Sequence, residues 1–202
     1  MHTFRRAILL SLALLLPAFA VPQSRDDSSL PRFEAGIGLT GIHLNHTGKN
    51  TAGLSGRFHY NFNDHLALDT EVFGAPAPNP KDFSPNAGGI SGLFGVRAGF
   101  RTGNSWNARG SFLRARTGFV HVGRSVGPPF AGTHAAYDFG PTFELYPHRN
   151  AAFRLDLGDV VIPYGNAFLF RIDSSGGLLR LIPLRLGTQH NFLLGAGFTI
   201  RF

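Results

Sequence analysis

Apolar and polar residues alternate along most of the chain after Pro31. Between residues 51 and 62, Leu54 and Phe58 fall on one face, and Arg57 falls on the other. A period of two over this length indicates a half-buried β-strand. The same alternation predicts eight strands, at about 33–40, 51–62, 66–73, 94–101, 112–120, 137–145, 153–158 and 192–202.

The connections between these strands alternate in length. Short connections are expected at 63–64, 102–107 and 147–150, and longer ones at 44–50, 74–91, 123–133 and 160–188. Short turns at one end and long loops at the other are typical of outer-membrane barrels. The sequence therefore predicts an all-β fold, an eight-stranded antiparallel up-and-down transmembrane β-barrel over 32–202. Pro141, inside the sixth strand, cannot donate a ladder hydrogen bond and predicts a bulge there.

Two alternatives stay open at this stage. A ten-stranded barrel would use the hairpin at about 160–188 as two further crossings, but 166–172 is short for a crossing of about 9–11 residues. A soluble lipocalin-type barrel would expose its polar stripe, normally with many lysines. Lys49 and Lys81 are the only lysines among the 19 basic residues, and neither lies in a predicted strand.

The charged strand residues all fall on the stripe opposite the apolar one. An arginine facing lipid at mid-membrane costs about 2–4 kcal/mol, so these residues are expected to face inward and pair. Glycine on the same stripe leaves room for them. The predicted lumen charge network comprises Glu34, Arg57, Asp69, Glu71, Arg97, Arg101, Arg114, Arg116, Asp138, Glu144, Arg154, Asp156 and Arg201.

The first twenty residues have the layout of a secretory signal peptide. Arg5 and Arg6 precede an apolar run at 7–16, which is followed by Ala18-Phe19-Ala20. This pattern predicts cleavage after Ala20, because the run is shorter than the roughly 20 residues of a spanning helix. Residues 21–31 are polar and aperiodic, and we interpret them as a flexible periplasmic lead-in.

Composition and charge exclude several classes of function. The 202 residues include no cysteine, which excludes a disulfide scaffold and a thiolate metal site. The formal charge of +7 and the pI of about 10.8 would suggest nucleic acid in a cytosolic chain, but an exported chain is not expected to bind it. His43 and His46 are interpreted as solvated loop histidines, and no metal or cofactor is predicted.

The chain resembles the OmpA/OmpX-like family of small bacterial outer-membrane β-barrels. The resemblance is carried by the signal at 1–20, by GVRAGFRTG and FLRARTG within 95–118, and by the last strand, HNFLLGAGFTIRF. It implies location in the bacterial outer membrane, contact with its lipid and lipopolysaccharide, and a monomer. It also implies that Phe198, Ile200 and Phe202 form the signal read by the barrel-assembly machinery.

Three functions are weighed. The first is a structural or surface-binding role, with the lumen plugged by arginine–carboxylate pairs. The second is a narrow porin-like channel, which the lumen charges disfavour. The third is a lipid A-modifying enzyme, for which His121 and Ser125 with Asp138 or Asp159 are the candidate residues. No acid is evidently placed for that triad, so the chain is not expected to be an enzyme.

The region at about 160–188 is expected to form an extended extracellular hairpin. Its exposed apolar residues would include Leu178, Leu179, Leu181, Ile182 and Leu184, a pattern that suggests a partner or lipid contact. Basic residues of the long loops predict a rim for lipopolysaccharide phosphates. This rim comprises Lys49, Lys81, Arg124, Arg171, Arg180 and Arg185.

Overall fold

The computed structural model describes residues 32–76, 88–102, 108–123, 130–148, 150–172 and 179–202, with side chains described except at 167–172 and 179–182. The predicted signal peptide and the lead-in at 21–31 lie outside the described residues. Within the described part, no helix is long and apolar enough to cross a membrane.

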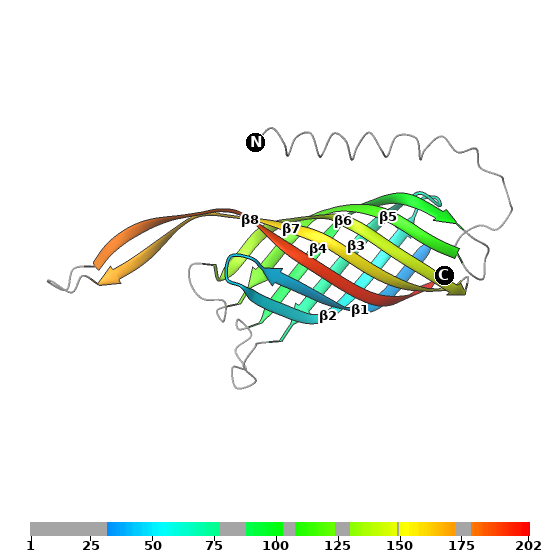
Figure 1. The fold of residues 1–202 in the computed structure, drawn as a ribbon, viewed down its shortest axis with the longest axis horizontal. Helices are drawn as coiled ribbons and strands as arrows, with labels where there is room; N and C mark the ends of the chain where they lie inside the picture. Colours follow the sequence, from blue (N-terminus) through cyan, green and yellow to red (C-terminus); the bar gives the residue numbers. More distant parts are fainter. Residues whose placement is uncertain (1–31, 77–87, 103–107, 124–129, 149, 173–178) are drawn as a thin grey trace. The chain divides into compact units, whose positions relative to one another are not determined.

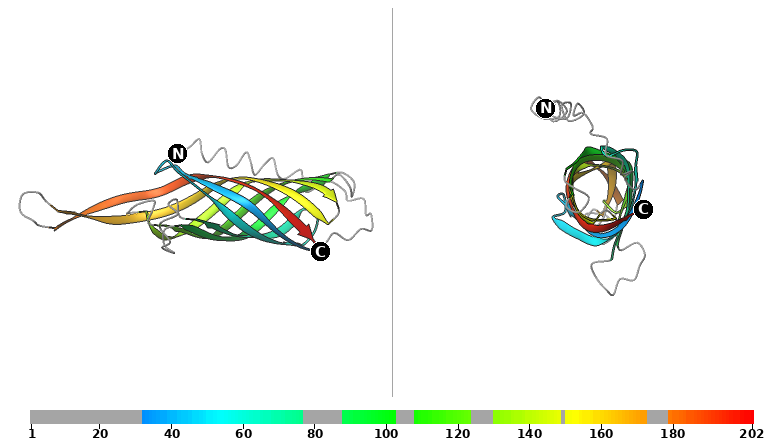
Figure 2. Two further views of the ribbon diagram at one scale, coloured as in Figure 1. Left: turned by 90° about the horizontal axis from the view of Figure 1, so that it is seen from below. Right: turned by 90° about the vertical axis from the view of Figure 1, so that its right-hand side faces the viewer.

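The described residues form a closed barrel of eight strands, each antiparallel to its neighbours (Figures 1 and 2). The strands are β1 Phe33–Leu44, β2 Lys49–Asn61, β3 Leu66–Ala75, β4 Gly89–Thr102, β5 Ala108–Val122, β6 Gly132–His148, β7 Ala151–Ile172 and β8 Leu179–Arg201. Neighbouring strands follow chain order, so the fold is an up-and-down barrel. The prediction of eight strands is confirmed.

The barrel closes where its first and last strands meet. Glu34 on β1 is in register with Arg201 on β8, and the ladder continues to His43 and Phe192. Phe33 N donates to Phe202 O over 3.0 Å and Phe202 N donates to Phe33 O over 2.9 Å. We call this end of the barrel the terminal end and the opposite one the ribbon end.

The predicted loop between the first two strands is shorter than expected. β1 reaches Leu44 and β2 begins at Lys49, so only residues 45–48 connect them instead of 44–50. The prediction was wrong because the alternation breaks at Gly41 and His43, although backbone pairing continues through them. Residues 160–172 and 179–188, where an extended hairpin is predicted, are strand and belong to β7 and β8.

The ends of β7 and β8 continue beyond the barrel as a two-stranded ribbon (Figures 1 and 2). Pairing of β7 with β6 ends at Val161, whereas its pairing with β8 runs on to Ile172↔Leu179. The register shifts around Gly165, which faces Gly187, and both have positive φ, 69° and 65°. Glycine adopts a positive φ without steric cost. The two glycines therefore allow the bulge at which the barrel ends and the ribbon begins.

The predicted bulge at Pro141 is absent. Phe139↔Asp159 and Thr142↔Asp156 lie at the same offset on either side of it, so no extra residue is inserted. On the side of β5, pairing continues through Pro141. On the side of β7, Gly140 and Pro141 have no partner, so the missing N–H of the proline coincides with a local gap in that ladder. A proline can therefore omit one ladder bond without shifting the register.

Candidate functional site

The lumen is lined by the inward stripe of each strand, and this stripe carries the charged residues. Of the thirteen predicted network residues, twelve are at most 5% exposed, and Arg101 is half-buried. Alternation along each strand places them inside, since the residues between them face outward. The charged residues occupy the part of the lumen from the terminal end to mid-barrel, which we call the charged half.

Glu34 is the centre of the charged layer nearest the terminal end of the barrel. Its carboxylate accepts from Arg201 Nε at 2.9 Å, from Arg97 Nη2 at 3.1 Å and from Asn61 Nδ2 at 2.9 Å. Arg97 also donates to Glu144, which Tyr146 contacts through its hydroxyl. One carboxylate thus holds together side chains from four strands.

A second layer lies nearer mid-barrel, around Asp156 and Asp69. Arg154 Nε donates to Asp156 at 2.9 Å and its Nη2 donates to Asp69 at 2.7 Å. Arg114 Nη1 also donates to Asp156, at 2.7 Å. Arg57 Nη1 lies 2.8 Å from the other oxygen of Asp156. Each buried acid therefore has several cationic partners, the condition under which charges can be held away from water.

Arg116 joins the same layer on the other side of the lumen. Its Nη1 donates to Glu71 at 2.6 Å, and its Nε donates to Asp138 at 2.8 Å. Asp138 also accepts from Arg114 Nε at 2.7 Å. The planar guanidinium suits this arrangement because it offers several donors in a fixed geometry.

His59 belongs to the network but was not among the predicted residues. It is fully buried, with Nδ1 3.3 Å from Glu34 and Nε2 2.6 Å from Arg154 Nη1. Arginine can only donate, so Nε2 accepts and Nδ1 carries the proton toward Glu34. His59 links the two layers. Its position on the inward stripe, two residues after Arg57, was the available signal.

Glycines on the inward stripe make space for the arginines. A Cβ on Gly158 would lie 2.6 Å from Arg114 Nη2 and 2.5 Å from Asp138 Oδ1, and one on Gly195 would lie 2.7 Å from Arg57 Nη2. These contacts are too short for real side chains. The interpretation of these glycines as spacers agrees with this packing.

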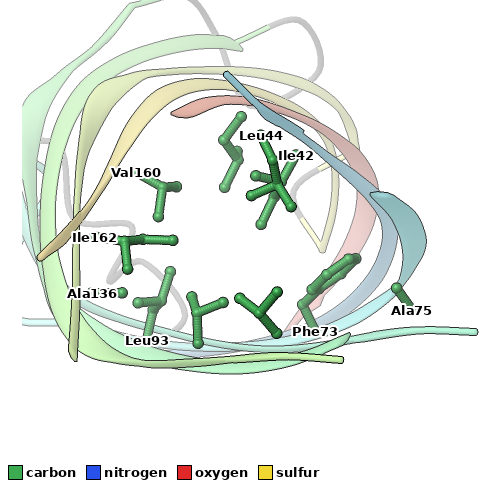
Figure 3. Packing of buried hydrophobic residues seen from close by; sticks show 11 residues of the cluster. Ile42, Leu44, Phe73, Ala75, Leu93, Ala136, Val160 and Ile162 are labelled. Atoms are coloured by element: carbon green, nitrogen blue, oxygen red, sulfur yellow. The ribbon is translucent and has the colours of Figure 1, made fainter. Parts of the chain in front are cut away.

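The lumen toward the ribbon end is apolar, which the sequence analysis did not anticipate. Its buried cluster, which we call the apolar half, comprises Ile42, Leu44, Phe73, Ala75, Leu93, Val120, Val122, Ala136, Val160, Ile162 and Leu193. Most of the labelled members, among them Ile42, Phe73 and Val160, point into the barrel from its wall (Figure 3). The inward stripe thus changes from charged to apolar along the axis.

A cavity of about 330 Å³ opens beside the apolar half at the ribbon end. Its apolar lining includes Ile42, Phe73 and Ile162, and its polar lining includes Lys49 and His121. This volume is within the range of small-molecule pockets, about 300–1,000 Å³. Lys49 of the predicted rim and His121 of the candidate triad therefore both line it.

The outer wall of the barrel is apolar over most of its height. Exposed large apolar side chains occur on all eight strands, including Ile37, Leu54, Val72, Phe94, Phe119, Phe139, Phe153 and Phe198. Phe202 is 63% exposed, and Ile200 and Phe198 are exposed on the same stripe. We call this surface the apolar belt.

Polar side chains replace the apolar belt toward the ribbon end. His43 Nδ1 lies 2.7 Å from Asn50 Oδ1, and His190 Nδ1 lies 2.6 Å from Asp159 Oδ2. On β8 the outward stripe runs from His190 through Phe192 to Phe202. The apolar stretch of this strand thus covers 192–202, about the length of an oblique bilayer crossing.

The candidate triad of a lipid-modifying enzyme is not assembled in the described part. His121 Nδ1 lies 2.9 Å from Thr133 Oγ1. Asp138 pairs with Arg114 and Arg116 in the lumen, and Asp159 pairs with His190 on the outer wall. Both acids considered for the triad thus have partners other than His121. Ser125 lies outside the described residues.

The predicted basic rim is only partly described. Lys49 and Arg185 are exposed, the first at the barrel mouth and the second in the ribbon. Arg171 and Arg180 face each other in the backbone register of the ribbon, and their side chains lie outside the described part. Lys81 and Arg124 lie outside it altogether. Of the predicted apolar hairpin residues, Leu184 is half-buried. Leu178 and the side chains of Leu179, Leu181 and Ile182 lie outside the described part.

No family model and no curated protein matches the chain. Its fold is similar to the N-terminal β-barrel domain of OprF from Pseudomonas aeruginosa, with 12% identity, a TM-score of 0.48, and coverage of 84% of this chain and 97% of that one. Neisserial surface protein A matches with 14% identity, a TM-score of 0.44, and coverage of 84% and 96%. Ail, the attachment invasion locus protein of Yersinia pestis, matches with 17% identity, a TM-score of 0.37, and coverage of 83% and 95%. With identities this low and TM-scores below 0.5, no function is transferred from these structures to this chain.

Proposed function

We propose that this chain is an integral outer-membrane β-barrel with a closed lumen, which anchors the β7–β8 ribbon and the basic rim at the cell surface. The observation that carries the proposal is the inverted distribution of side chains. Large apolar residues face outward on all eight strands, whereas twelve ion-pairing residues of the predicted network are buried inside. A soluble barrel would be expected to carry its charged residues on the outer wall and its apolar residues inside, because its outer wall faces water.

The apolar belt is too extensive for an aqueous surface. Soluble monomers rarely expose contiguous apolar patches above a few hundred Å², and here apolar side chains encircle the barrel. Antiparallel closure satisfies the backbone hydrogen bonds that lipid cannot satisfy. The polar pairs His43–Asn50 and His190–Asp159 then mark the level at which the ribbon end leaves the hydrocarbon region.

The test is fractionation of cells followed by gel electrophoresis with and without boiling. We expect the chain in the outer-membrane fraction, with a mobility that changes on heating because the closed barrel resists unfolding. Recovery in the soluble periplasmic fraction would overturn the proposal.

Two variants test the depth of the apolar belt. Phe94→Arg, in the middle of β4, is expected to destabilise the inserted barrel by about 2–4 kcal/mol, whereas Asn50→Arg, beyond the belt, is expected to cost about 0–1 kcal/mol. Reversible urea unfolding in lipid vesicles measures both. Equal costs for the two variants would contradict the proposed position of the membrane.

We further propose that the lumen does not conduct ions. An eight-stranded barrel leaves space for little more than its own side chains. Along the axis, the ion-pair layers around Glu34 and Asp156 are followed by the apolar half, so a hydrated ion would have to cross two barriers of different kinds. Planar bilayers with purified protein should show no steady conductance. Large reproducible channels would favour the porin-like alternative.

The surface role rests on the ribbon and rim. We propose that the exposed Lys49 and Arg185, with the other rim arginines, contact lipopolysaccharide phosphates. Replacing the six predicted rim residues by glutamine should weaken lipopolysaccharide binding to the purified barrel, and an unchanged affinity would remove the idea. The exposed Phe198, Ile200 and Phe202 remain proposed as the signal for the barrel-assembly machinery.

A further inference from the structure

The barrel wall has a short strand at the ribbon end. β3 ends at Ala75, and its pairing with β2 stops at Leu54↔Gly74. β2 nevertheless continues to Lys49, paired with β1. On the other side of β3, Gly89 of β4 is in register with Ala75. Among the described strands, β2 and β4 therefore approach each other here without β3 between them.

The cavity at the ribbon end lies at this seam. Its lining combines residues of the inward stripe, such as Val120 and Ile162, with residues of the outward stripe, including Ile90 and His121. Ile90 is 47% exposed and continues the apolar belt. A cavity lined from both faces of the wall extends to the lipid-facing side of the barrel as well as to the lumen.

We propose that this cavity binds the alkyl chain of a single-chain anionic amphiphile, of which a fatty acid is the simplest, entering sideways from the surrounding lipid. The inference rests on the proposed membrane location. Continuity of the cavity with the lipid-facing belt at Ile90 indicates the source of the ligand, and the apolar half indicates the chemistry of its tail.

The polar edge of the cavity indicates the chemistry of the head group. Lys49, Asn50 and Thr51 begin β2 at the open side, and His121 lies opposite on β5. With the alkyl chain against Ile42, Phe73 and Ile162, a carboxylate at the open side would meet the ammonium of Lys49. A cation and hydrogen-bonding groups at one end of an apolar cavity match a carboxylate with a hydrocarbon tail.

The cavity is a binding site with a closed inner end. Beyond the apolar half, the lumen is filled by the Arg57, Glu71 and Asp156 pairs. An alkyl chain bound in the cavity would leave these ion pairs intact. To pass through the lumen, the chain would have to break them. The site therefore fits retention of a lipid at the barrel wall rather than passage across the membrane.

The experiment uses the full mature barrel in phospholipid nanodiscs and a diazirine analogue of palmitic acid. After illumination, mass spectrometry should locate crosslinks at the beginning of β2 and the end of β5, and unlabelled palmitic acid should compete for them. Crosslinks spread evenly over the apolar belt, without competition, would identify ordinary surrounding lipid and overturn the proposal.

A matched pair of variants separates the cavity from the belt. A Cβ on Gly89 would have ordinary contacts, 3.5 Å from His121 O and 3.8 Å from Thr51 Cγ2, so Gly89→Phe fills the cavity from the inward stripe. On the outward stripe of β2, away from the seam, a Cβ on Gly56 meets nothing within 4 Å, so Gly56→Phe is the control. We expect Gly89→Phe to lower competitive binding about tenfold or more, the loss of about 1.4 kcal/mol or more of tail contact, and Gly56→Phe to leave it unchanged.

A second filling variant and a head-group variant complete the test. Thr51→Trp blocks the same cavity from β2 if Gly89→Phe does not fold. Lys49→Gln should weaken palmitic acid binding by up to about fivefold, the range of an exposed ion pair, and leave hexadecanol binding unchanged. If wild type and both filling variants bind palmitic acid equally, the proposed binding site is wrong. If Lys49→Gln weakens the binding of palmitic acid and of hexadecanol equally, the assignment of Lys49 to the head group is wrong.

The same samples separate this inference from the proposed function. A barrel that inserts and shows the heat-dependent mobility change, but fails to bind palmitic acid at the seam, overturns the cavity proposal alone. A chain that binds palmitic acid in detergent at this cavity, but is recovered from cells in the soluble fraction, overturns the outer-membrane function and the sideways entry.

Discussion

The two halves of the lumen are built on the same strands and the same inward stripe, yet they are held together by different forces. On β3 the stripe changes within two residues, from Glu71 to Phe73, and on β7 it changes from Asp156 to Val160 across Gly158. The charged half is a network in which most members have several partners. The apolar half is a packed cluster without specific pairing.

This difference determines how each half tolerates change. Removing one member of a buried ion network leaves its partners charged and unsatisfied, which costs more than the contact itself. Removing apolar volume costs the transfer free energy of the lost atoms and the cavity they leave. The charged half is therefore expected to be the more demanding in sequence, although it is not necessarily the larger source of stability.

The largest expected effect is that of removing a central cation from the charged half. Arg154→Met removes the guanidinium that donates to Asp69 at 2.7 Å and to Asp156 at 2.9 Å, and leaves each acid with fewer cationic partners. We expect a loss of about 3–5 kcal/mol in the free energy of unfolding, measured by urea unfolding in lipid vesicles. Arg109→Met, at an exposed position of β5, is the control. If both variants unfold at the same urea concentration, the network does not behave as a buried unit.

A smaller effect is expected from truncation in the apolar half. Leu193, on β8, is 1% exposed within the cluster, so Leu193→Ala should cost about 2–4 kcal/mol. The conservative variant Leu193→Met should cost less than about 1.5 kcal/mol, because it keeps the volume. An alanine variant as stable as wild type would show that this end of the lumen is loosely packed, and would weaken the contrast between the halves.

The architecture was largely predictable because each strand repeats one pattern. Strict alternation in β2 and β8, with short connections at the terminal end, was sufficient for the number of strands and their order. The end of β1 was missed for a physical reason. At Gly41 and His43 the outward stripe leaves the apolar belt, so hydrophobicity no longer distinguishes the two faces, although Ile42 and Leu44 remain inside.

The site was predictable only where charge marked the phase. All thirteen charged residues were assigned to the lumen because lipid excludes them. The alternation on the third strand puts Phe73 on the same stripe as Glu71. The apolar half was not found because most of its members, including Ile42, Val160 and Ile162, lie beyond the ends of the predicted strands. His59 and the seam between β2 and β4 depend on contacts among several strands, which a pattern along one strand does not specify.

The smallest expected effect separates burial from pairing, using two acids on one strand. Asp156 is fully buried with arginine partners, whereas Asp159, three residues later, lies on the outer wall with its side chain 47% exposed and pairs with His190. Asp159→Asn should change the free energy of unfolding by about 0–1 kcal/mol, because water and ions screen an exposed pair. Raising the NaCl concentration should reduce this difference further, while the larger cost of Asp156→Asn should persist, since buried charges are screened much less. If the two variants lost stability equally and with the same salt dependence, pairing rather than burial would control the energetics of the charged half.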